Sequence, residues 1–598
     1  MTETATETAD RSAAVSGRKW AGIGAAVGLS LLLDLPGIGW GLPARWHPDE
    51  KADVVARMVE ERSLAPDSFI NPALPLYLLW PLVWLQDRAT SAGWLSGGLS
   101  DPLLLARALS ALAGAGAVWL LGILGRRSLG DRLGTWPPFL LAVAPGFVNL
   151  CHFATPEPWL ILGTTVTLTL AMAHLEGRAP AWLVGLALGL TLATKYTAVA
   201  VLVPVLLAVW LRPRPRWGRP GGALLLGAGI GSLAVGWTLL SRVGGDLAGR
   251  LHLRDPRLLH AEHALGLVRA LGGAAVATGL LALVVGVLAW RGRPWARRLG
   301  RPEVLVVVAV AGAVFLAANP YVAIEPLAFL SDLAYNHQTR YEYKGLVGAS
   351  SAYVPYARLL TSALSWPLLV AAGLGVLAAV GRALSGHAKG LVMAAAAVAP
   401  FLLVASSGHT ALRFLAPMLP AAAWLAALGL GTLHRARAPL FGLVLARAAL
   451  GSILLARLFH VDSRLQAADW VETHVPRGAT VDLIANHAGY APSLPDGRSY
   501  RLVRALSREM APVSAFVEAA ASYPDAASEW LVLTASYYER FLENPEQQPE
   551  RAAFFRDLLD GRGRFEVMAR FRQQGWLRPE AEFLDPEIVI LRKRLGKL

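Results

Sequence analysis

The sequence predicts an α-helical polytopic membrane protein with a small α/β domain at its C-terminal end. Three observations predict this fold class: the overall composition, a series of long apolar stretches, and a change of composition near Asp462. The chain has 598 residues, of which 55% are hydrophobic and only 16% are charged, and its mean hydropathy is +0.45. Soluble proteins carry about 25% charged residues. The composition therefore excludes a soluble globular enzyme.

The apolar stretches are long enough to cross a membrane. A spanning helix needs about 20 mostly apolar residues, and by this criterion the chain has about 13 candidate spans. They cover residues 20–43, 101–125, 134–151, 157–175, 181–194, 196–211, 221–241, 265–290, 303–318, 359–381, 390–406, 414–433 and 439–459. Because spans 181–194 and 196–211 are short, we expect a tight helix pair that reverses near Lys195.

The formal net charge of +14 comes mainly from arginines in the links between spans. No separate basic domain exists to hold a duplex, so the charge does not indicate nucleic-acid binding. The basic links are Arg126, Arg127, Arg178, 212–219, 291–301, Arg382, Lys389, Arg435 and Arg437. Such a bias marks cytoplasmic loops. It predicts a cytoplasmic tail at residues 1–19 and outer loops at residues 44–100, 242–264 and 319–358.

An odd number of spans places the C-terminal segment outside. We therefore expect a transmembrane domain at residues 20–460 and an extracytoplasmic domain at residues 461–598. Arg447 lies inside the last span, where a charge is costly unless it is paired. If residues 439–459 lay on the membrane surface instead, the C-terminal domain would be cytoplasmic.

Strand-like and helical stretches alternate in the C-terminal segment, which predicts a small α/β domain. The expected strands are Thr480–Ile484, Trp530–Thr534, Phe565–Phe571 and Glu587–Leu591, and the expected helices include Leu465–His474 and Arg551–Asp560. The single cysteine, Cys151, excludes an intramolecular disulfide and a thiolate zinc site.

The strongest local motif is Trp46-His47-Pro48-Asp49-Glu50-Lys51, which follows the first span. The next stretch is amphipathic, with Val54, Val55, Met58 and Val59 on one helical face, so we expect a helix in the membrane interface. The two carboxylates of the motif have two interpretations. They suit the dipole at the N-terminus of this helix, or they perform acid–base chemistry at the membrane surface.

Several further motifs carry a family resemblance. They are His47-Pro48-Asp49-Glu50, Asn71-Pro72-Ala73-Leu74-Pro75-Leu76-Tyr77, Arg107-Ala108-Leu109-Ser110, Ala154-Thr155-Pro156-Glu157, Gly189–Tyr196, Asn319-Pro320-Tyr321, Arg413–Pro417 and the segment Ala467–Pro476. With these motifs the sequence resembles the bacterial dolichyl-phosphate-mannose-protein mannosyltransferase-like family. This is glycosyltransferase family 39 with its relatives, which include the aminoarabinose transferase of lipid A. The resemblance extends over nearly the whole chain, through motifs that are each short and degenerate.

The resemblance implies a GT-C fold in the cytoplasmic (inner) membrane and a polyprenyl-phosphate-linked sugar as donor. It also implies that an acidic residue of the first outer loop activates the acceptor. Asp49 then takes the catalytic position, and Glu50 stands beside it. Glu157 falls where the family usually has an aspartate, so its role, acceptor positioning or electrostatic, is open. Asn71 begins a motif that is more often His-Pro-Pro, so a histidine role at this position is absent.

Basic and aromatic residues on the same predicted face are the expected substrate ligands. Lys195 lies in the membrane region, which indicates a phosphate partner unless the side chain snorkels from a helix end. Arg413, at the mouth of the next-to-last span, suits bidentate phosphate binding, with a helix-end ion pair as the alternative. His337, Arg340 and Tyr341 belong to a polar and aromatic loop that could contact phosphate or sugar, or could face solvent.

The residues and the resemblance together predict an inverting glycosyltransferase. It would move a sugar from a polyprenyl-phosphate donor to a hydroxyl or phosphate of a lipid, polysaccharide or protein on the outer face of the membrane. Asp49 would deprotonate the acceptor while Lys195 and Arg413 hold the departing phosphate. The alternatives are a lipid-linked sugar transporter or flippase, although no paired half-repeat is visible, and a non-catalytic relative that binds lipid-linked sugar. The sequence requires no metal, although the acidic cluster could bind a divalent cation.

Overall fold

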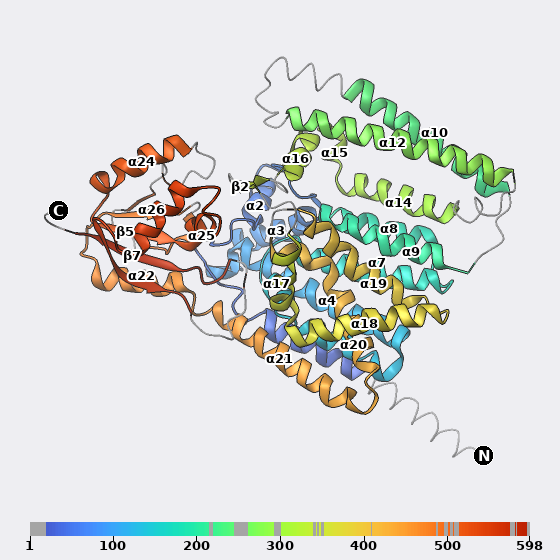
Figure 1. Cartoon of the computed structure of the whole chain (residues 1–598), viewed down its shortest axis with the longest axis horizontal. Coiled ribbons are helices and arrows are strands. Elements are labelled where there is room, and N and C mark those ends of the chain that lie inside the picture. Colours follow the sequence, from blue (N-terminus) through green and yellow to red (C-terminus); the bar gives the residue numbers. More distant parts are fainter. Residues whose placement is uncertain are drawn as a thin grey trace.

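The structure of the chain is a computed structural model, which describes residues 20–213, 219–243, 261–291, 301–338, 342–343, 346–347, 352–407, 410–485, 488–494, 500–502, 506, 513–573, 581 and 583–594. Its helices form a bundle in which most of them run side by side, and the C-terminal domain lies at one end of this bundle (Figure 1). The predicted fold class, a helical polytopic membrane protein with a small C-terminal sheet domain, is confirmed.

Helices make up nearly all of the described chain before the C-terminal domain. In chain order they are Trp20–Asp34, α2 (Ala52–Glu60), α3 (Leu74–Ser91), α4 (Pro102–Leu133), α5 (Trp136–Ala142), α6 (Pro145–Cys151), α7 (Glu157–Leu175), α8 (Ala181–Leu192), α9 (Leu202–Leu211), α10 (Arg219–Thr238), α12 (Ala261–Trp290), α14 (Pro302–Ala318), α15 (Tyr321–Ile324), α16 (Pro326–Gln338), α17 (Tyr353–Leu364), α18 (Trp366–Leu384), α19 (Lys389–Ala405), α20 (Leu419–Gly431) and α21 (Arg437–Leu458). In the described part of the chain, six helices are long and apolar enough to cross a membrane, and six shorter apolar helices accompany them.

Two predicted spans are each broken into two helices. Residues 134–151 form α5 and α6, which meet at Ala144, whose backbone is extended. The break is expected before Pro145, because proline disfavours the helical conformation of the preceding residue. Residues 359–381 are divided at Ser365, whose φ of 65° is left-handed and ends α17. The predicted reversal near Lys195 is confirmed, since α8 ends at Leu192 and the next helical segment starts at Tyr196.

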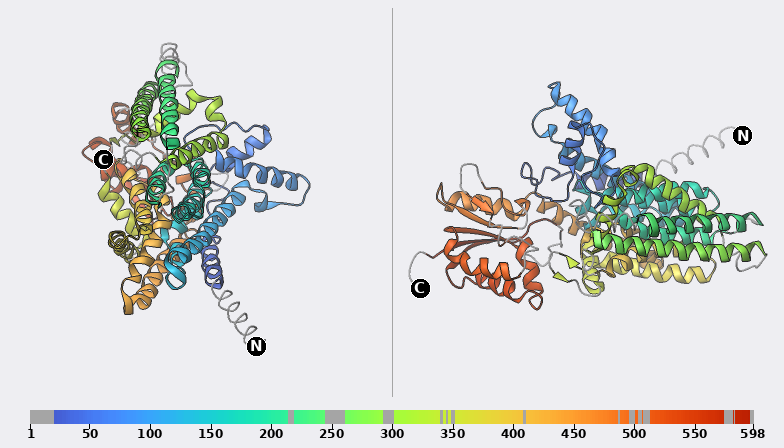
Figure 2. Two further views of the ribbon diagram at one scale, coloured as in Figure 1. Left: turned by 90° about the vertical axis from the view of Figure 1, so that its right-hand side faces the viewer. Right: turned by 90° about the horizontal axis from the view of Figure 1, so that it is seen from above.

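The segment between the first helix and α4 contains two helices, α2 and α3. The predicted amphipathic helix is α2, but protein rather than lipid covers its apolar face. Val55 and Val59 are buried against Val83 of α3, and Ala52 packs on Leu103 of α4. Helix α3 projects sideways from the bundle, as the blue segment in the right-hand view of Figure 2 shows. The two helices therefore form a platform beside the end of the bundle.

The C-terminal domain is a five-stranded mixed sheet with helices on both faces. The strands are β3 (Val481–Ile484), β4 (Tyr500–Leu502), β5 (Trp530–Thr534), β6 (Phe565–Phe571) and β7 (Ile588–Lys593), in the order β4-β3-β5-β7-β6. Strand β3 runs parallel to β4 and β5, whereas β7 is antiparallel to β5 and β6. The four predicted strands are therefore confirmed, and β4, which has only three residues, was not predicted.

Side chains alternate between the two faces of the sheet along each strand, and this alternation separates two small hydrophobic cores. The helices of the domain are α22 (Ser463–His474), α24 (Val513–Ala526), α25 (Ala535–Glu543) and α26 (Pro549–Leu559). Leu531 and Leu533 of β5 face the core shared with α24, α25 and α26, whereas Trp530 and Val532 face the core shared with α22. Successive side chains of a strand point to opposite faces. A strand buried on both faces is consequently apolar over nearly its whole length, and β5 is apolar from Trp530 to Leu533.

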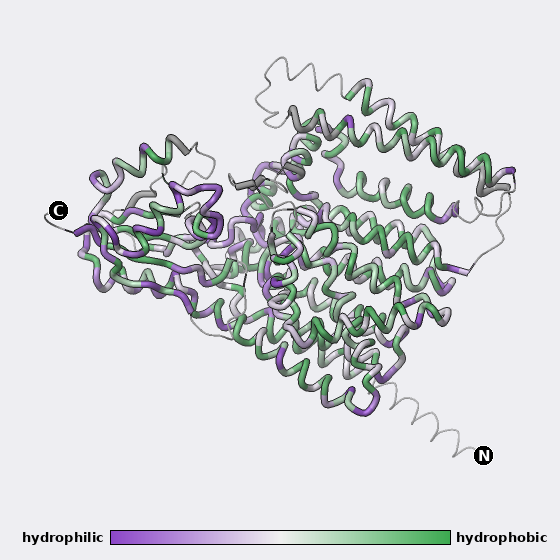
Figure 3. Tube along the Cα trace, in the orientation of Figure 1, coloured by the Kyte–Doolittle hydropathy of each residue, from purple (hydrophilic) through white to green (hydrophobic). Residues whose placement is uncertain are grey.

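Described residues of four basic links that were predicted to share one side of the membrane lie together. Glu176 forms ion pairs with both Arg178 and Lys389, and Arg301 donates a hydrogen bond to the carbonyl oxygen of Arg212 at 2.9 Å. These links are at the end of the bundle opposite to the C-terminal domain (Figure 1). Figure 3 shows hydrophilic residues at the two ends of the bundle and hydrophobic ones along its length.

Replacement of Gly375 by leucine should prevent the close packing of α18 on α20. A Cβ at this position would overlap the backbone carbonyl of Leu425, which cannot move aside. We expect a loss of stability of about 3 kcal/mol or more, measured as a lower midpoint of thermal unfolding in lipid nanodiscs. Gly373→Leu is the control, since no atom lies within 4 Å of its Cβ position. Equal midpoints for the two variants would contradict the packing described.

Candidate active site

Arg107 and Glu50 form a buried ion pair at the end of the bundle that carries the C-terminal domain. Nε and Nη2 of Arg107 donate to the two carboxylate oxygens of Glu50 at 2.7 and 2.6 Å, and the side chains are 1% and 3% exposed. Nη1 donates to the carbonyl oxygens of Ile38 and Trp40 at 2.7 and 2.6 Å, and the N–H of Ala154 donates to Glu50 at 2.8 Å. The guanidinium thus joins α4 to the loop that precedes α2 and to the loop that precedes α7.

Asp49 is the exposed member of the acidic pair. Its Oδ2 accepts a hydrogen bond from Nη1 of Arg413 at 2.7 Å, and 47% of its side chain is exposed. Burial alone would raise the pKa of Asp49, but the positive charge of Arg413, with smaller contributions from His47, Lys195 and Lys51, outweighs burial and holds the pKa below its ordinary value. Asp49 is therefore a carboxylate at neutral pH, able to accept a proton.

Lys195 and Glu157 form a second ion pair next to Asp49. Lys195 Nζ contacts Glu157 Oε1, and the two side chains are 10% and 2% exposed. Lys195 has extended backbone between α8 and the 3₁₀ helix η2 (Tyr196–Val201), and Glu157 is the first residue of α7. The ammonium is thus held at the end of the bundle by a buried carboxylate, rather than exposed at a helix end.

The two cations of the site lie against one aromatic ring. Arg413 belongs to the 3₁₀ helix η4 (Leu412–Met418), which packs against η2. Lys195 Nζ is 5.5 Å from the ring centroid of Phe414, and the guanidinium carbon of Arg413 is 5.6 Å from the same centroid. The predicted meeting of Asp49, Glu157, Lys195 and Arg413 at one end of the bundle therefore occurs in the structure.

His47 supports the backbone of Asp49. Its Nδ1 accepts a hydrogen bond from the N–H of Asp49 at 3.1 Å, and its ring packs on Phe153 and Phe583, with centroid distances of 4.4 and 4.2 Å. Burial lowers the pKa of His47 to about 4, so the ring is neutral at neutral pH. With Nδ1 as acceptor, the proton of the neutral ring is on Nε2.

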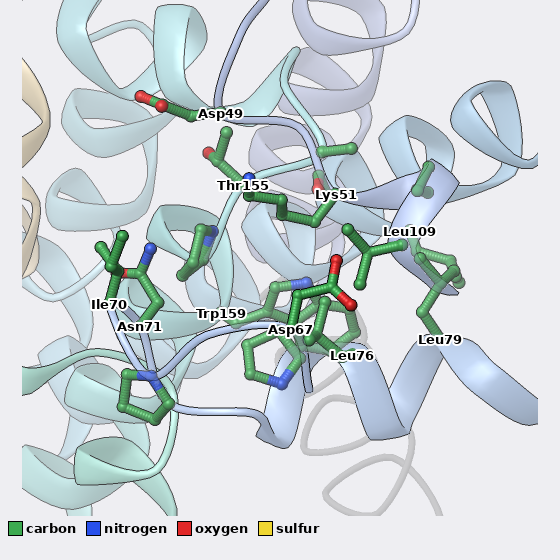
Figure 4. Close-up of a pocket in the computed structure, with 18 of the residues that line it drawn as sticks. Asp49, Lys51, Asp67, Ile70, Asn71, Leu76, Leu79, Leu109, Thr155 and Trp159 are labelled. Atoms are coloured by element: carbon green, nitrogen blue, oxygen red, sulfur yellow. The ribbon is translucent and has the colours of Figure 1, made fainter. Parts of the chain in front are cut away.

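A pocket of about 160 Å³ opens beside Asp49, between the platform of α2 and α3 and the ends of α4 and α7. Its polar lining includes Asp49, Lys51, Asp67 and Asn71, and Trp159 forms part of its wall (Figure 4). The remainder of the lining is largely apolar, as the following residues show: Ala52, Val54, Ile70, Pro72, Pro75, Leu76, Leu79, Ala106, Leu109, Ala154 and Pro156. Such a mixed pocket suits an amphiphilic ligand.

Helix α16 holds the loop that lines this pocket. The N–H of Phe69 donates to Asp332 at 2.6 Å, and Nδ2 of Asn336 donates to the carbonyl oxygen of Ile70 at 2.8 Å. The predicted ligand His337 lies in α16, whereas Arg340 and Tyr341 lie outside the described residues. Over the part of the chain that the structure describes, no group of three or more His, Cys, Asp or Glu residues could hold a metal ion.

Sequence reasoning did not select three residues that shape the site. Arg107 is a charged residue inside an apolar span, and the cost of burying such a charge could have marked it. Phe414 belongs to the motif Arg413–Pro417 that carries the resemblance, but nothing in that motif marks its ring as a contact of the two cations. Phe583 comes from the C-terminal domain, and its ring centroid lies 5.4 Å from the guanidinium carbon of Arg413. This contact depends entirely on tertiary structure.

A family model described as dolichyl-phosphate-mannose-protein mannosyltransferase matches residues 94–237. The predicted resemblance is confirmed for this segment. It contains Arg107, Glu157 and Lys195, and it supports glycosyltransferase activity in general terms. No protein of curated function matches the sequence.

Two solved structures are similar to this chain over most of its length. ArnT from Cupriavidus metallidurans, bound to undecaprenyl phosphate, is 13% identical over 96% of this chain and 98% of that chain, with a TM-score of 0.43. The oligosaccharyltransferase AglB from Archaeoglobus fulgidus, in complex with an inhibitory peptide and a dolichol-phosphate, is 13% identical over 92% of this chain and 72% of that chain, with a TM-score of 0.45. At such low identity and TM-score, neither structure assigns a role to the residues described above.

Loss of the buried guanidinium should destabilise the protein. Arg107→Leu leaves the Glu50 carboxylate buried without its partner, which costs about 3–5 kcal/mol. We expect a lower midpoint of thermal unfolding in nanodiscs. The control is Arg127→Leu, an exposed position on the same helix, which should leave the midpoint unchanged. An unchanged midpoint for Arg107→Leu would show that the pair does not stabilise the fold.

Proposed function

We propose that the protein is an inverting glycosyltransferase that uses a polyprenyl-phosphate-linked sugar as donor. The observation that carries the proposal is the half-exposed Asp49 carboxylate at the rim of an amphiphilic pocket, with Arg413 and Lys195 beside it. The match of residues 94–237 to a family described by a dolichyl-phosphate sugar supports the class of donor.

Asp49 is suited to the role of general base. It would take the proton of the acceptor hydroxyl while the acceptor oxygen attacks the anomeric carbon of the sugar. The new bond forms from the face opposite to the phosphate, the bond between anomeric carbon and phosphate oxygen breaks, and the configuration is inverted. A phosphate acceptor would attack in the same way with its own anionic oxygen and would need no base.

Arg413 and Lys195 are suited to stabilise the departing polyprenyl phosphate. Negative charge develops on the phosphate oxygen as its bond to the sugar breaks, and fixed cations next to that oxygen lower the barrier. A guanidinium has five N–H donors in a planar fork, so Arg413 can hold Asp49 and a phosphate together. Glu157 would then set the position of the Lys195 ammonium, and Glu50 would position the loop through Arg107.

The proposed reaction takes place on the outer face of the cytoplasmic membrane. The site lies at the end of the bundle opposite to the basic links, and such links favour the cytoplasm. The C-terminal domain then lies outside. A lipid donor would reach Asp49 from the membrane, along the apolar side of the pocket, and the acceptor would be a lipid, a polysaccharide or a protein.

Asp49→Asn should abolish transfer without loss of the fold. An asparagine cannot accept the proton, so we expect kcat to fall by about 100- to 10,000-fold. The measurement is the release of undecaprenyl phosphate from undecaprenyl-phosphate-linked glucose or mannose by the full chain in nanodiscs. Asp53→Asn, an exposed aspartate four residues away, is the control. Turnover by Asp49→Asn near that of the wild type would remove Asp49 from the mechanism.

Arg413→Gln should change the pH dependence of the reaction as well as its rate. The base acts as a carboxylate, so activity is lost as the pH falls through the pKa of Asp49. Arg413 lowers that pKa, and its removal should raise it, so the acid limb of the kcat/KM profile should move to higher pH. The KM for donor should also rise about tenfold or more. Arg358→Gln, a change at an exposed arginine, is the control. If the acid limb of Arg413→Gln did not move, the proposed influence of Arg413 on the pKa of Asp49 would be excluded.

A further inference from the structure

Phe583 and Leu584, described residues between β6 and β7, pack from the C-terminal domain against the bundle. Leu584, in the connection between these strands, is 3% exposed and belongs to the main core of the bundle. One residue earlier, the ring of Phe583 lies 5.4 Å from the guanidinium carbon of Arg413 and 4.2 Å from the ring centroid of His47. A single aromatic ring of the C-terminal domain therefore touches both the phosphate-binding candidate and the support of Asp49.

Arg413 contacts two aromatic rings of different origin. Phe414, its neighbour in the bundle, is 5.6 Å from the guanidinium carbon, and Phe583 is 5.4 Å away. A guanidinium over an aromatic face is attracted by the ring quadrupole, and the attraction grows as water is excluded. Two such rings restrict the directions in which the N–H donors of Arg413 can point.

The backbone of this connection is strained. Phe583 has a φ of 66° and Asp585 a φ of 48°, and the left-handed region is unfavourable for a bulky residue such as phenylalanine. Strained conformations of this kind persist only where the surroundings fix them, and they gather at functional sites. Phe583 therefore requires firm contacts that hold its backbone in this conformation.

A fully buried cluster of charged residues holds the backbone of Phe583 in this conformation. Nη2 of Arg464 donates to the carbonyl oxygen of Phe583 at 2.9 Å and to Asp462 at 2.8 Å. The N–H of Asp585 donates to Asp462 at 2.9 Å, and Asp585 accepts from the N–H of Ser463 at 3.0 Å. Arg464 and Asp462 are both 0% exposed. Phe583 is thus held at its carbonyl oxygen, and the chain two residues later at Asp585, by α22 and by Asp462, which precedes it.

The same cluster also contacts the loop that carries Asp49. The guanidinium carbon of Arg464 is 4.4 Å from the ring centroid of Trp46 and 4.9 Å from that of Trp40, and the indole N–H of Trp40 donates to Asp462 at 3.1 Å. The placement of Phe583 and the placement of the loop before α2 are therefore linked through one buried arginine.

We infer that Phe583 is a positioning residue of the active site, through which the C-terminal domain fixes the orientation of the Arg413 guanidinium toward Asp49 and the donor phosphate. This inference rests on the proposed function. The C-terminal domain is then a part of the catalytic apparatus, because it supplies one of the two rings that define where Arg413 points. A ring that only filled space between the domain and the bundle would affect stability and nothing else.

The test compares Phe583→Leu and Phe583→Met, which lack an aromatic face, with Phe583→Tyr, which keeps one. Each variant is assayed as the full chain in nanodiscs. With undecaprenyl-phosphate-linked glucose or mannose as donor, the assay gives the donor KM, kcat and the dependence of kcat/KM on pH. Binding of undecaprenyl phosphate is measured as the rise that it causes in the midpoint of thermal unfolding. Phe554→Leu, an aromatic change on α26 in the core that this helix shares with α24 and α25, is the matched control.

For the leucine and methionine variants we expect the donor KM to rise about five- to tenfold and kcat to change less. The acid limb of the kcat/KM profile should move to higher pH. Phe583→Tyr and Phe554→Leu should keep the wild-type KM and limb. Lower unfolding midpoints with unchanged KM and pH profile would overturn the inference, since the ring would then only pack. If the wild type shows no transfer, the proposed function fails. The inference is then decided by the binding of undecaprenyl phosphate. Phe583→Leu and Phe583→Met should bind this lipid more weakly than the wild type. Unchanged binding would overturn the inference.

Discussion

The bidentate ion pair between Arg107 and Glu50 is the contact on which the geometry of the site depends. A guanidinium and a carboxylate that are removed from water must neutralise each other and satisfy their remaining hydrogen-bonding atoms. Arg107 does so with Glu50 and with the carbonyl oxygens of Ile38 and Trp40. The chain between the first helix and α2 is thereby fixed. Asp49, one residue before Glu50, faces Arg413 and the pocket instead of the interior.

Two connections between helices, each ending in an extended residue, place the cations. Lys195 and Ala411, which precedes η4, have extended backbone, and each is followed by a 3₁₀ segment that leads into an apolar helix. A charge at such a break lies at the end of the bundle, where it avoids the full cost of the membrane centre. Lys195 and Arg413 each have a carboxylate partner, Glu157 and Asp49 respectively, so the cluster is electrically balanced before any phosphate arrives.

Parts of the chain that are far apart in sequence meet at this end. The loop before α2 supplies the carboxylates, η4 supplies Arg413, and the connection between β6 and β7 supplies Phe583. The buried cluster around Arg464 joins the first of these parts to the last. The C-terminal domain is therefore bound to the bundle by charged and aromatic contacts next to the site, and not only by the chain between α21 and α22.

The sequence by itself determined the features that depend on neighbours along the chain. Apolar stretches gave the helices of the bundle, alternation in the C-terminal segment gave four of five strands, and the distribution of arginines placed Asp49, Glu157, Lys195 and Arg413 at one end. The resemblance pointed to Asp49 as the base, but only the tertiary structure shows that Glu50 is the buried carboxylate of the pair and Asp49 the exposed one. Which of them is buried depends on Arg107, 57 residues from Glu50 along the chain, and Phe583 joins Arg413 across the boundary between domain and bundle. Local pattern carries no record of such contacts, because they arise only when distant segments pack together.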